Sequence, residues 1–145
     1  SAGGHLTLML ALGSDDGNPK AEDPVERESD RIAAAVAYCP PTDLRTLVGK
    51  NEKYPALDFD SAKADSVSPI LLATKDDAPT LLVHGDADST VPIASSKNMF
   101  AALNDAGVPN DFITLPGAEH AFKGEQAQQA AVALAKWFDK YLLGK

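Results

Sequence analysis

The sequence predicts an α/β fold with about three parallel strands flanked by helices. Short apolar runs that suit buried strands alternate along the chain with longer segments that suit helices. This alternating order is typical of α/β proteins whose strands run parallel. The length of 145 residues matches the usual size of one domain, so we expect a single domain over residues 1–145.

The first expected element is a helix that ends near Leu12. Residues 6–12 read LTLMLAL and leave almost no polar face, a pattern typical of a buried helix, and Gly13 can end it. His5 is expected to be a packing residue of this helix. Residues 15–30 are mostly acidic and contain prolines, so we expect a solvated loop there.

The first expected strand is Ile32–Tyr38, an apolar run that two prolines follow closely. A short continuous apolar run bounded by prolines suits a strand that is buried on both faces. Thr42 or Asp43 can cap a short helix that extends to Val48. A second short helix is expected to open at Ser68.

The second half of the chain gives clearer signals. Thr80–His84 and Asp111–Leu115 are expected strands, because each is a short run rich in apolar and β-branched residues. Helices are expected over about 93–104, ended by Gly107, and over 126–142. The residues expected to face the core are Ser96, Met99, Phe100 and Leu103 on the first helix, and Ala127, Ala131, Leu134, Phe138 and Tyr141, with Trp137 beside them, on the second.

Composition and charge argue against several classes of protein. The net charge of −8 argues against nucleic acid and anionic membranes as partners, because phosphate groups need a basic surface. The single cysteine, Cys39, excludes an intrachain disulfide and a multi-cysteine metal site, and its place at a strand end suits a small buried side chain. No apolar run approaches the roughly 20 residues that span a bilayer. No signal-peptide pattern is visible at the amino end.

A serine, an aspartate and a histidine occupy positions where α/β proteins place their active sites. Asp88 follows the strand 80–84, His120 follows the strand 111–115, and Ser1 precedes the first helix. Functional groups in open α/β sheets lie just beyond the carboxyl ends of the strands. A serine hydroxyl needs a base within hydrogen-bond reach, a histidine can supply it, and a carboxylate fixes the tautomer of the imidazole.

Three motifs resemble those of α/β-hydrolase esterases. SAGGHL at residues 1–6 resembles the second half of their nucleophile elbow, G-x-S-A-G-G-H. LLVHGDADSTVP at residues 81–92 resembles their acid turn, and LPGAEHAF at residues 115–122 resembles their histidine loop. YCPPTDL at residues 38–44 is similar to the stretch after their sixth strand. The group resembled is the bacterial esterases and lipases related to carbohydrate and feruloyl esterases, which overlaps in pattern with prolyl-oligopeptidase-like hydrolases.

The resemblance implies a role for each candidate residue. Ser1 corresponds to the nucleophile, Asp88 to the triad acid and His120 to the general base, while the backbone N–H of Ala2 corresponds to an oxyanion donor. The acid of the family stands three residues before a valine, a spacing that favours Asp88 over its neighbour Asp86. The implied reaction is hydrolysis of a small-molecule carboxylic ester through an acyl-enzyme, with no metal or cofactor. A peptidase of the prolyl-oligopeptidase type would use the same triad.

The motifs cover only the carboxyl-terminal half of the hydrolase fold. The first glycine of the elbow, the strand before Ser1 and the HGGG-like oxyanion loop have no counterpart in the sequence, so residues 1–145 are expected to form a partial hydrolase domain that starts at the nucleophile. The strand Ile32–Tyr38 would then present an open edge to an amino-terminal half or to another copy of the chain. A non-catalytic half-domain that needs its amino-terminal half is the alternative from another class.

Overall fold

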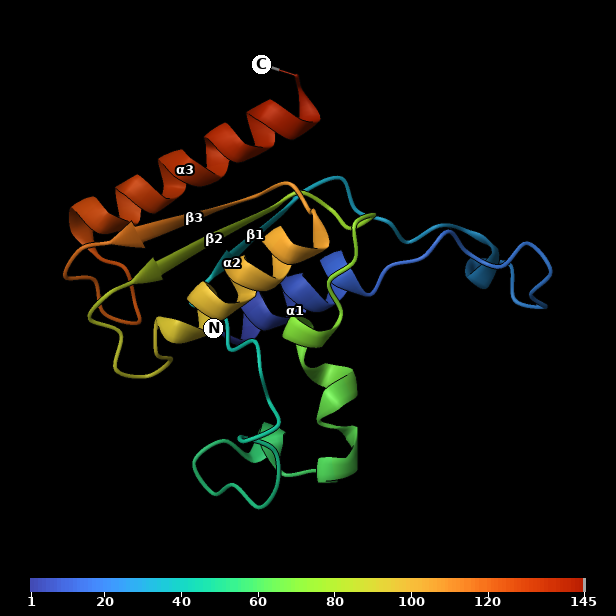
Figure 1. Ribbon diagram of the computed structural model, residues 1–145, viewed down its shortest axis with the longest axis horizontal. Coiled ribbons are helices and arrows are strands. Elements are labelled where there is room, and N and C mark those ends of the chain that lie inside the picture. Colours follow the sequence, from blue (N-terminus) through green and yellow to red (C-terminus); the bar gives the residue numbers. More distant parts are fainter. Residues whose placement is uncertain (145) are drawn as a thin grey trace.

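The computed structural model describes residues 1–144 and consists of one parallel sheet with helices on both faces (Figure 1). The strands are β1 (Ala35–Tyr38), β2 (Thr80–Gly85) and β3 (Asn110–Leu115), and the helices are α1 (Ala2–Leu12), α2 (Ala94–Ala106) and α3 (Gly124–Leu142). Short 3-10 turns span Val25–Arg27, Pro55–Leu57, Ser61–Lys63, Asp65–Val67 and Pro69–Leu71. The predicted α/β class and the parallel pairing of three strands are confirmed.

The sheet has the order β1-β2-β3, with β2 in the centre and fully buried. Thr80 of β2 lies opposite Ala35 on one side and Asn110 on the other. The first strand is shorter than the predicted Ile32–Tyr38, since its pairing with β2 begins only at Ala35. The neighbouring strand explains this start. The residue before Thr80 is Pro79, which accepts a hydrogen bond from the Ala35 N–H at 2.8 Å but has no N–H to extend the ladder.

Alternate residues of β2 pack against different helix layers. Leu82 belongs to a core with Leu8 of α1 and with Met99 and Leu103 of α2. Leu81 and Val83 belong to a second core that Leu115, Ala130 and Trp137 complete from β3 and α3. Figure 1 shows the same division, with α1 and α2 on one side of the sheet and α3 on the other. This division arises because successive side chains of a β-strand point to opposite faces of the sheet.

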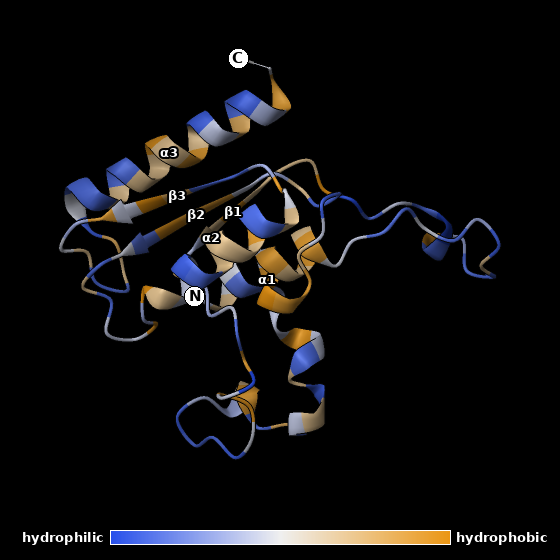
Figure 2. Ribbon diagram, viewed as in Figure 1, coloured by the Kyte–Doolittle hydropathy of each residue, from blue (hydrophilic) through white to orange (hydrophobic). Residues whose placement is uncertain are grey.

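The helix α1 is only half buried, so the predicted buried helix is wrong for one of its faces. Leu8, Ala11 and Leu12 pack in the core, whereas Leu6 and Leu10 are 60% and 63% exposed. Figure 2 shows the apolar colouring of α1 and the polar character of the loop that follows it. Leu6 and Leu10 lie four residues apart, so they form an exposed apolar face on α1.

Two further predictions need correction. The expected helix from Thr42 to Val48 is absent from the described residues, where the chain forms turns instead. The Asp43 carboxylate accepts hydrogen bonds from the backbone N–H and the guanidinium of Arg45, and such local bonds compete with helical hydrogen bonding. On α3 the predicted core face is confirmed at Trp137, Phe138 and Tyr141, but Ala131 is exposed and Ala130 is buried in its place.

Other predicted boundaries are close to the observed ones. The helix α2 ends before Gly107, which adopts a left-handed conformation with a φ of 80°. The short helix predicted at Ser68 is the 3-10 turn Pro69–Leu71. The strand β1 forms one edge of the described sheet. Among residues 1–144, no helix combines the length and hydropathy needed to cross a membrane.

Candidate active site

The loops that follow β2 and β3 are tied together at the carboxyl end of the sheet. The Asp86 N–H donates to the Leu115 carbonyl at 3.2 Å. The Ala87 N–H donates to the Ala118 carbonyl at 3.1 Å. The Asp86 carboxylate accepts a further hydrogen bond from the Gly117 N–H at 2.6 Å. These bonds hold the two loops in one arrangement and bring their polar side chains together.

Asp88 and His120 make direct contact across these loops. Asp88 Oδ2 lies 2.7 Å from His120 Nδ1. Asp88 Oδ1 accepts hydrogen bonds from the backbone N–H groups of Thr90 at 2.8 Å and Val91 at 2.9 Å. Because an ionised carboxylate can only accept, Nδ1 of His120 carries the proton and Nε2 remains as the basic nitrogen.

The surroundings of Asp88 favour its ionised form. The side chain is completely buried, and this burial has the largest single effect on its pKa, which it raises. The hydrogen bonds from His120, Val91 and Thr90 act in the opposite direction. Together they outweigh burial and hold the pKa of Asp88 below its ordinary value, so the carboxylate is charged at neutral pH.

Ser1 stands at the N-cap of α1 and lies close to His120. Ser1 and His120 line one hollow of about 280 Å³. Within residues 1–144, the Ser1 hydroxyl donates no hydrogen bond to His120. The structure therefore joins Asp88 to His120 and places Ser1 in the same hollow as His120, without a hydrogen bond between them. Ala2 lies in the first turn of α1, where backbone N–H groups lack helical acceptors and the helix dipole is positive.

The hollow beside Ser1 is mostly apolar. Its other lining residues come from β1 and the position after it, from the loop after β3 and from α3: Tyr38, Cys39, Phe122, Ala127, Ala130 and Ala131. Cys39 is buried, as predicted, and its backbone is left-handed with a φ of 46°, a strained conformation for this residue type. Burial is the main cause that raises the pKa of Cys39 to about 11, so its thiol is protonated and not a competing nucleophile.

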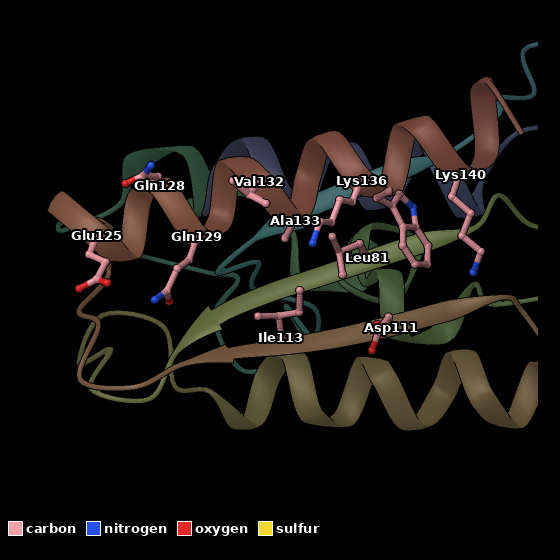
Figure 3. A pocket seen from close by; sticks show the side chains of 11 residues that line it. Leu81, Asp111, Ile113, Glu125, Gln128, Gln129, Val132, Ala133, Lys136 and Lys140 are labelled. Carbon is pink, nitrogen blue, oxygen red and sulfur yellow. The ribbon is translucent and has the colours of Figure 1, made fainter. Parts of the chain in front are cut away.

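A larger hollow of about 660 Å³ lies between α3 and the sheet (Figure 3). Its lining residues are Leu81, Asp111, Ile113, Glu125, Gln128, Gln129, Val132, Ala133, Lys136, Trp137 and Lys140. This set contains no serine, cysteine or histidine, so it offers neither a hydroxyl or thiol nucleophile nor an imidazole base. The smaller hollow beside Ser1 and His120 is therefore the better candidate for chemistry.

Sequence reasoning missed His84, the last side chain of the apolar run in β2. It is fully buried, and its Nε2 lies 3.2 Å from Asp88 Oδ2. The ligand atoms of Cys39, His84 and Asp88 all lie within 4.8 Å of one another, a set that could hold a metal. Both nitrogens of His84 and both oxygens of Asp88 already have hydrogen-bond partners in the protein. The one available signal was that a histidine inside a buried strand needs polar partners.

The remaining candidates have structural partners. His5 Nε2 lies 2.8 Å from the Val67 carbonyl oxygen, so this histidine joins α1 to a neighbouring turn. Asp86 bonds the backbone of the histidine loop and makes no hydrogen bond to an imidazole. Glu119 is exposed.

Replacing Gly85 by alanine is expected to separate the two loops of the site. A Cβ at this position would lie 2.6 Å from the Ala118 carbonyl carbon and would overlap its oxygen. We expect Gly85→Ala to lower the free energy of unfolding by about 1–3 kcal/mol, as overpacking does, and to move His120 away from Asp88. Urea unfolding measures the change in the free energy of unfolding. Gly3→Ala is the control, because its Cβ would meet no atom within 4 Å and should not destabilise the protein; equal behaviour of the two variants would contradict the close approach.

Comparisons with known proteins agree with this architecture. Residues 24–145 match the prolyl oligopeptidase family. The chain is 32% identical over 133 residues to Esterase LipQ of Mycobacterium tuberculosis, a match that covers 84% of this chain and 31% of that protein. It is 29% identical over 87 residues to the uncharacterized peptidase YuxL of Bacillus subtilis, covering 57% of this chain and 13% of that protein.

Among solved structures, the chain is similar to an acetyl ester-xyloside bifunctional hydrolase from Caldicellulosiruptor lactoaceticus. The TM-score is 0.81 at 28% identity, and the match covers 97% of this chain and 54% of that chain. The chain therefore spans about one third of the length of the curated esterase and about half of the solved hydrolase. These matches confirm the resemblance to α/β-hydrolase esterases. Because the family match extends over most of its length, the chain belongs to the prolyl oligopeptidase family of α/β-hydrolases.

Proposed function

We propose that the chain carries the catalytic residues of a serine hydrolase that cleaves carboxylic esters. The observation that carries the proposal is the 2.7 Å contact between Asp88 Oδ2 and His120 Nδ1 beside the N-cap serine of α1. In this account Ser1 is the nucleophile, His120 the general base and Asp88 the triad acid. The backbone N–H of Ala2 donates to the oxyanion.

The proposed reaction has two halves that use the same residues. His120 Nε2 takes the proton of the Ser1 hydroxyl while Oγ attacks the carbonyl carbon of the ester, and the oxyanion forms at the Ala2 N–H. The tetrahedral intermediate then expels the alcohol, which takes the proton from His120. Water repeats the sequence on the acyl-enzyme and releases the carboxylic acid, which restores Ser1. Ionised Asp88 stabilises the imidazolium in both halves.

A peptidase of the prolyl-oligopeptidase type is the second candidate. The family match and the similarity to a protein named as a peptidase favour it, and the same three residues would serve as its triad. A matched pair of substrates separates the two functions. We expect kcat/KM for a short-chain aryl ester to exceed that for the aryl amide of a short prolyl peptide. A larger kcat/KM for the amide would make the peptidase the better assignment.

We further propose that the catalytic unit includes an additional polypeptide segment. The backbone edge of β1 is open in the described sheet, and Leu6 and Leu10 on α1 are 60% and 63% exposed. Open edges and large apolar patches are surfaces on which another chain or segment binds. The relatives are longer than this chain, so they have residues to supply such a segment.

The 145-residue chain alone is therefore expected to self-associate and to hydrolyse ester very slowly. Removing a single oxyanion donor costs about 10²–10³ in kcat, and an elbow without a preceding strand holds Ser1 less firmly than an anchored one. Light scattering gives the mass, and ester hydrolysis is measured with and without an added polypeptide that corresponds to the amino-terminal part of the α/β-hydrolase fold. We expect that polypeptide to restore a defined mass and turnover. A stable monomer that turns over ester unaided would contradict this expectation.

A further inference from the structure

His84 is buried in β2 directly behind Asp88. Its ring lies on the side of the sheet that α2 covers, with Nδ1 2.7 Å from Ser96 Oγ. Its Nε2 lies 2.9 Å from the Val91 carbonyl oxygen and 3.2 Å from Asp88 Oδ2. The His84 side chain is fully buried. Because buried polar atoms need hydrogen-bond partners, these contacts satisfy both ring nitrogens inside the core.

The partners of His84 fix where its proton resides. The Val91 carbonyl can only accept a hydrogen bond, so Nε2 of His84 carries a proton. Burial lowers the pKa of His84 and outweighs the Val91 carbonyl and Asp88, which raise it, so the ring is neutral at pH 7. Nδ1 is then unprotonated and accepts a hydrogen bond from the Ser96 hydroxyl.

The Nε2 proton of His84 points at the segment that holds Asp88. Val91 contacts both residues, since its N–H donates to Asp88 Oδ1 at 2.9 Å and its carbonyl accepts from His84 at 2.9 Å. The same Nε2 lies 3.2 Å from Oδ2, the oxygen that faces His120. His84 therefore contacts Asp88 directly and also through the backbone of Val91.

The titratable groups that face His84 come from the residues after each of the three strands. Asp88 follows β2, His120 follows β3, and Cys39 follows β1. The Cys39 thiol is protonated because burial raises its pKa to about 11. Asp88 thus provides the negative charge beside His84, and His84 presents an N–H dipole to it without adding a positive charge.

We propose that His84, oriented by Ser96, is a positioning residue that keeps the Asp88 carboxylate directed at His120. The inference rests on the proposed function in one respect, that Asp88 is the triad acid. His84 touches no substrate and acts only through Asp88. A displacement of about 1 Å in a catalytic group can cost about 10²-fold in rate, so a residue that fixes Asp88 has a measurable effect on turnover.

Two substitutions separate positioning from packing. His84→Leu fills much of the same volume without a polar atom, whereas His84→Gln retains an N–H near the place of Nε2. His5→Gln is the matched control, because it removes a histidine whose Nε2 also meets a backbone carbonyl, that of Val67, at 2.8 Å. The chain has three histidines, so single substitutions assign every imidazole signal in an NMR spectrum.

The measurements are the pKa of Asp88 from its carboxyl carbon shift and the low-field resonance of the His120 Nδ1 proton. They use labelled protein in the monodisperse form defined by light scattering. We expect His84→Leu to raise the pKa of Asp88 toward its ordinary value, to weaken the His120 signal, and to lower kcat about 10²-fold with KM unchanged. We expect His84→Gln to restore most of both signals and His5→Gln to leave them unchanged.

A folded His84→Leu protein with unchanged Asp88 pKa and unchanged His120 resonance would overturn the proposal. If His84→Leu does not fold, Ser96→Ala takes its place, since it keeps the ring and removes only the hydroxyl that donates to Nδ1. Ser96→Ala is expected to shift the same signals in the same direction, and their invariance would also overturn the proposal. These readouts need no turnover. The NMR signals therefore test the positioning role of His84, whereas ester hydrolysis tests the proposed function, and the two can fail separately.

Discussion

Replacing Ser1 or His120 by alanine is expected to reduce hydrolysis of a short-chain aryl ester by about 10⁴-fold or more. In the proposed mechanism Ser1 supplies the oxygen that forms the acyl-enzyme, and the imidazole that contacts Asp88 takes its proton. Without His120, the Ser1 hydroxyl keeps its proton and is a weak nucleophile. The measurement is kcat/KM of the active preparation, which contains the additional segment where that segment is needed.

The two losses should not multiply in the double variant. In the proposed mechanism Ser1 and His120 act in one proton transfer, so once one of them is replaced, replacing the other should cause little further loss of turnover. We therefore expect the double variant to be about as slow as either single variant. Near-normal turnover in either single variant would remove the triad assignment. His5→Gln serves as the control, because that histidine bonds the Val67 carbonyl rather than Asp88.

The second large effect distinguishes two aspartates on the same loop. Asp88→Asn is expected to reduce turnover by about 10⁴-fold, because an amide N–H in place of a carboxylate oxygen selects the wrong tautomer of His120. Asp86→Asn should cost far less, since Asp86 contacts the Gly117 N–H and no imidazole. Kinetics of the two variants under identical conditions provide the test. The reverse ranking would show that Asp86 is the acid.

Stability at different pH values provides a separate check on Asp88. Its pKa is lower in the folded protein than its ordinary value, so the ionised carboxylate contributes stability that is present above about pH 3.9. That contribution is lost as the pH falls through the lower pKa of the folded state. The Asp88→Asn variant lacks this acid dependence, which urea unfolding at several pH values measures. An identical pH profile in wild type and variant would contradict the hydrogen bonding described for Asp88.

The sheet could be predicted from the sequence because its strands carry strong local signals. Thr80–His84 is an apolar run bounded by turn residues, and the observed strand Thr80–Gly85 differs by one residue. Gly107 marks the end of α2 through its left-handed backbone. The proximity of Asp88 to His120 was also predictable, since both follow neighbouring parallel strands.

Other features depend on long-range packing that local patterns do not encode. The short β1 results from Pro79 in the neighbouring chain segment, and the turn at Asp43 results from a carboxylate that bonds Arg45. Leu6 is 60% exposed, although its apolar side chain predicted burial. His84 was missed because its partner Ser96 lies on another element, and only the folded chain shows that its ring reaches Asp88.

The most direct test of the central claim is the site of covalent labelling by a fluorophosphonate, mapped by mass spectrometry of the active preparation. This reagent reacts with a serine that a neighbouring base activates. We expect a single adduct on Ser1, with labelling lost in His120→Ala, strongly slowed in Asp88→Asn and unchanged in Asp86→Asn. An adduct on a different serine, or labelling of Ser1 at an undiminished rate in His120→Ala, would contradict the assignment of Ser1, Asp88 and His120 as one catalytic unit.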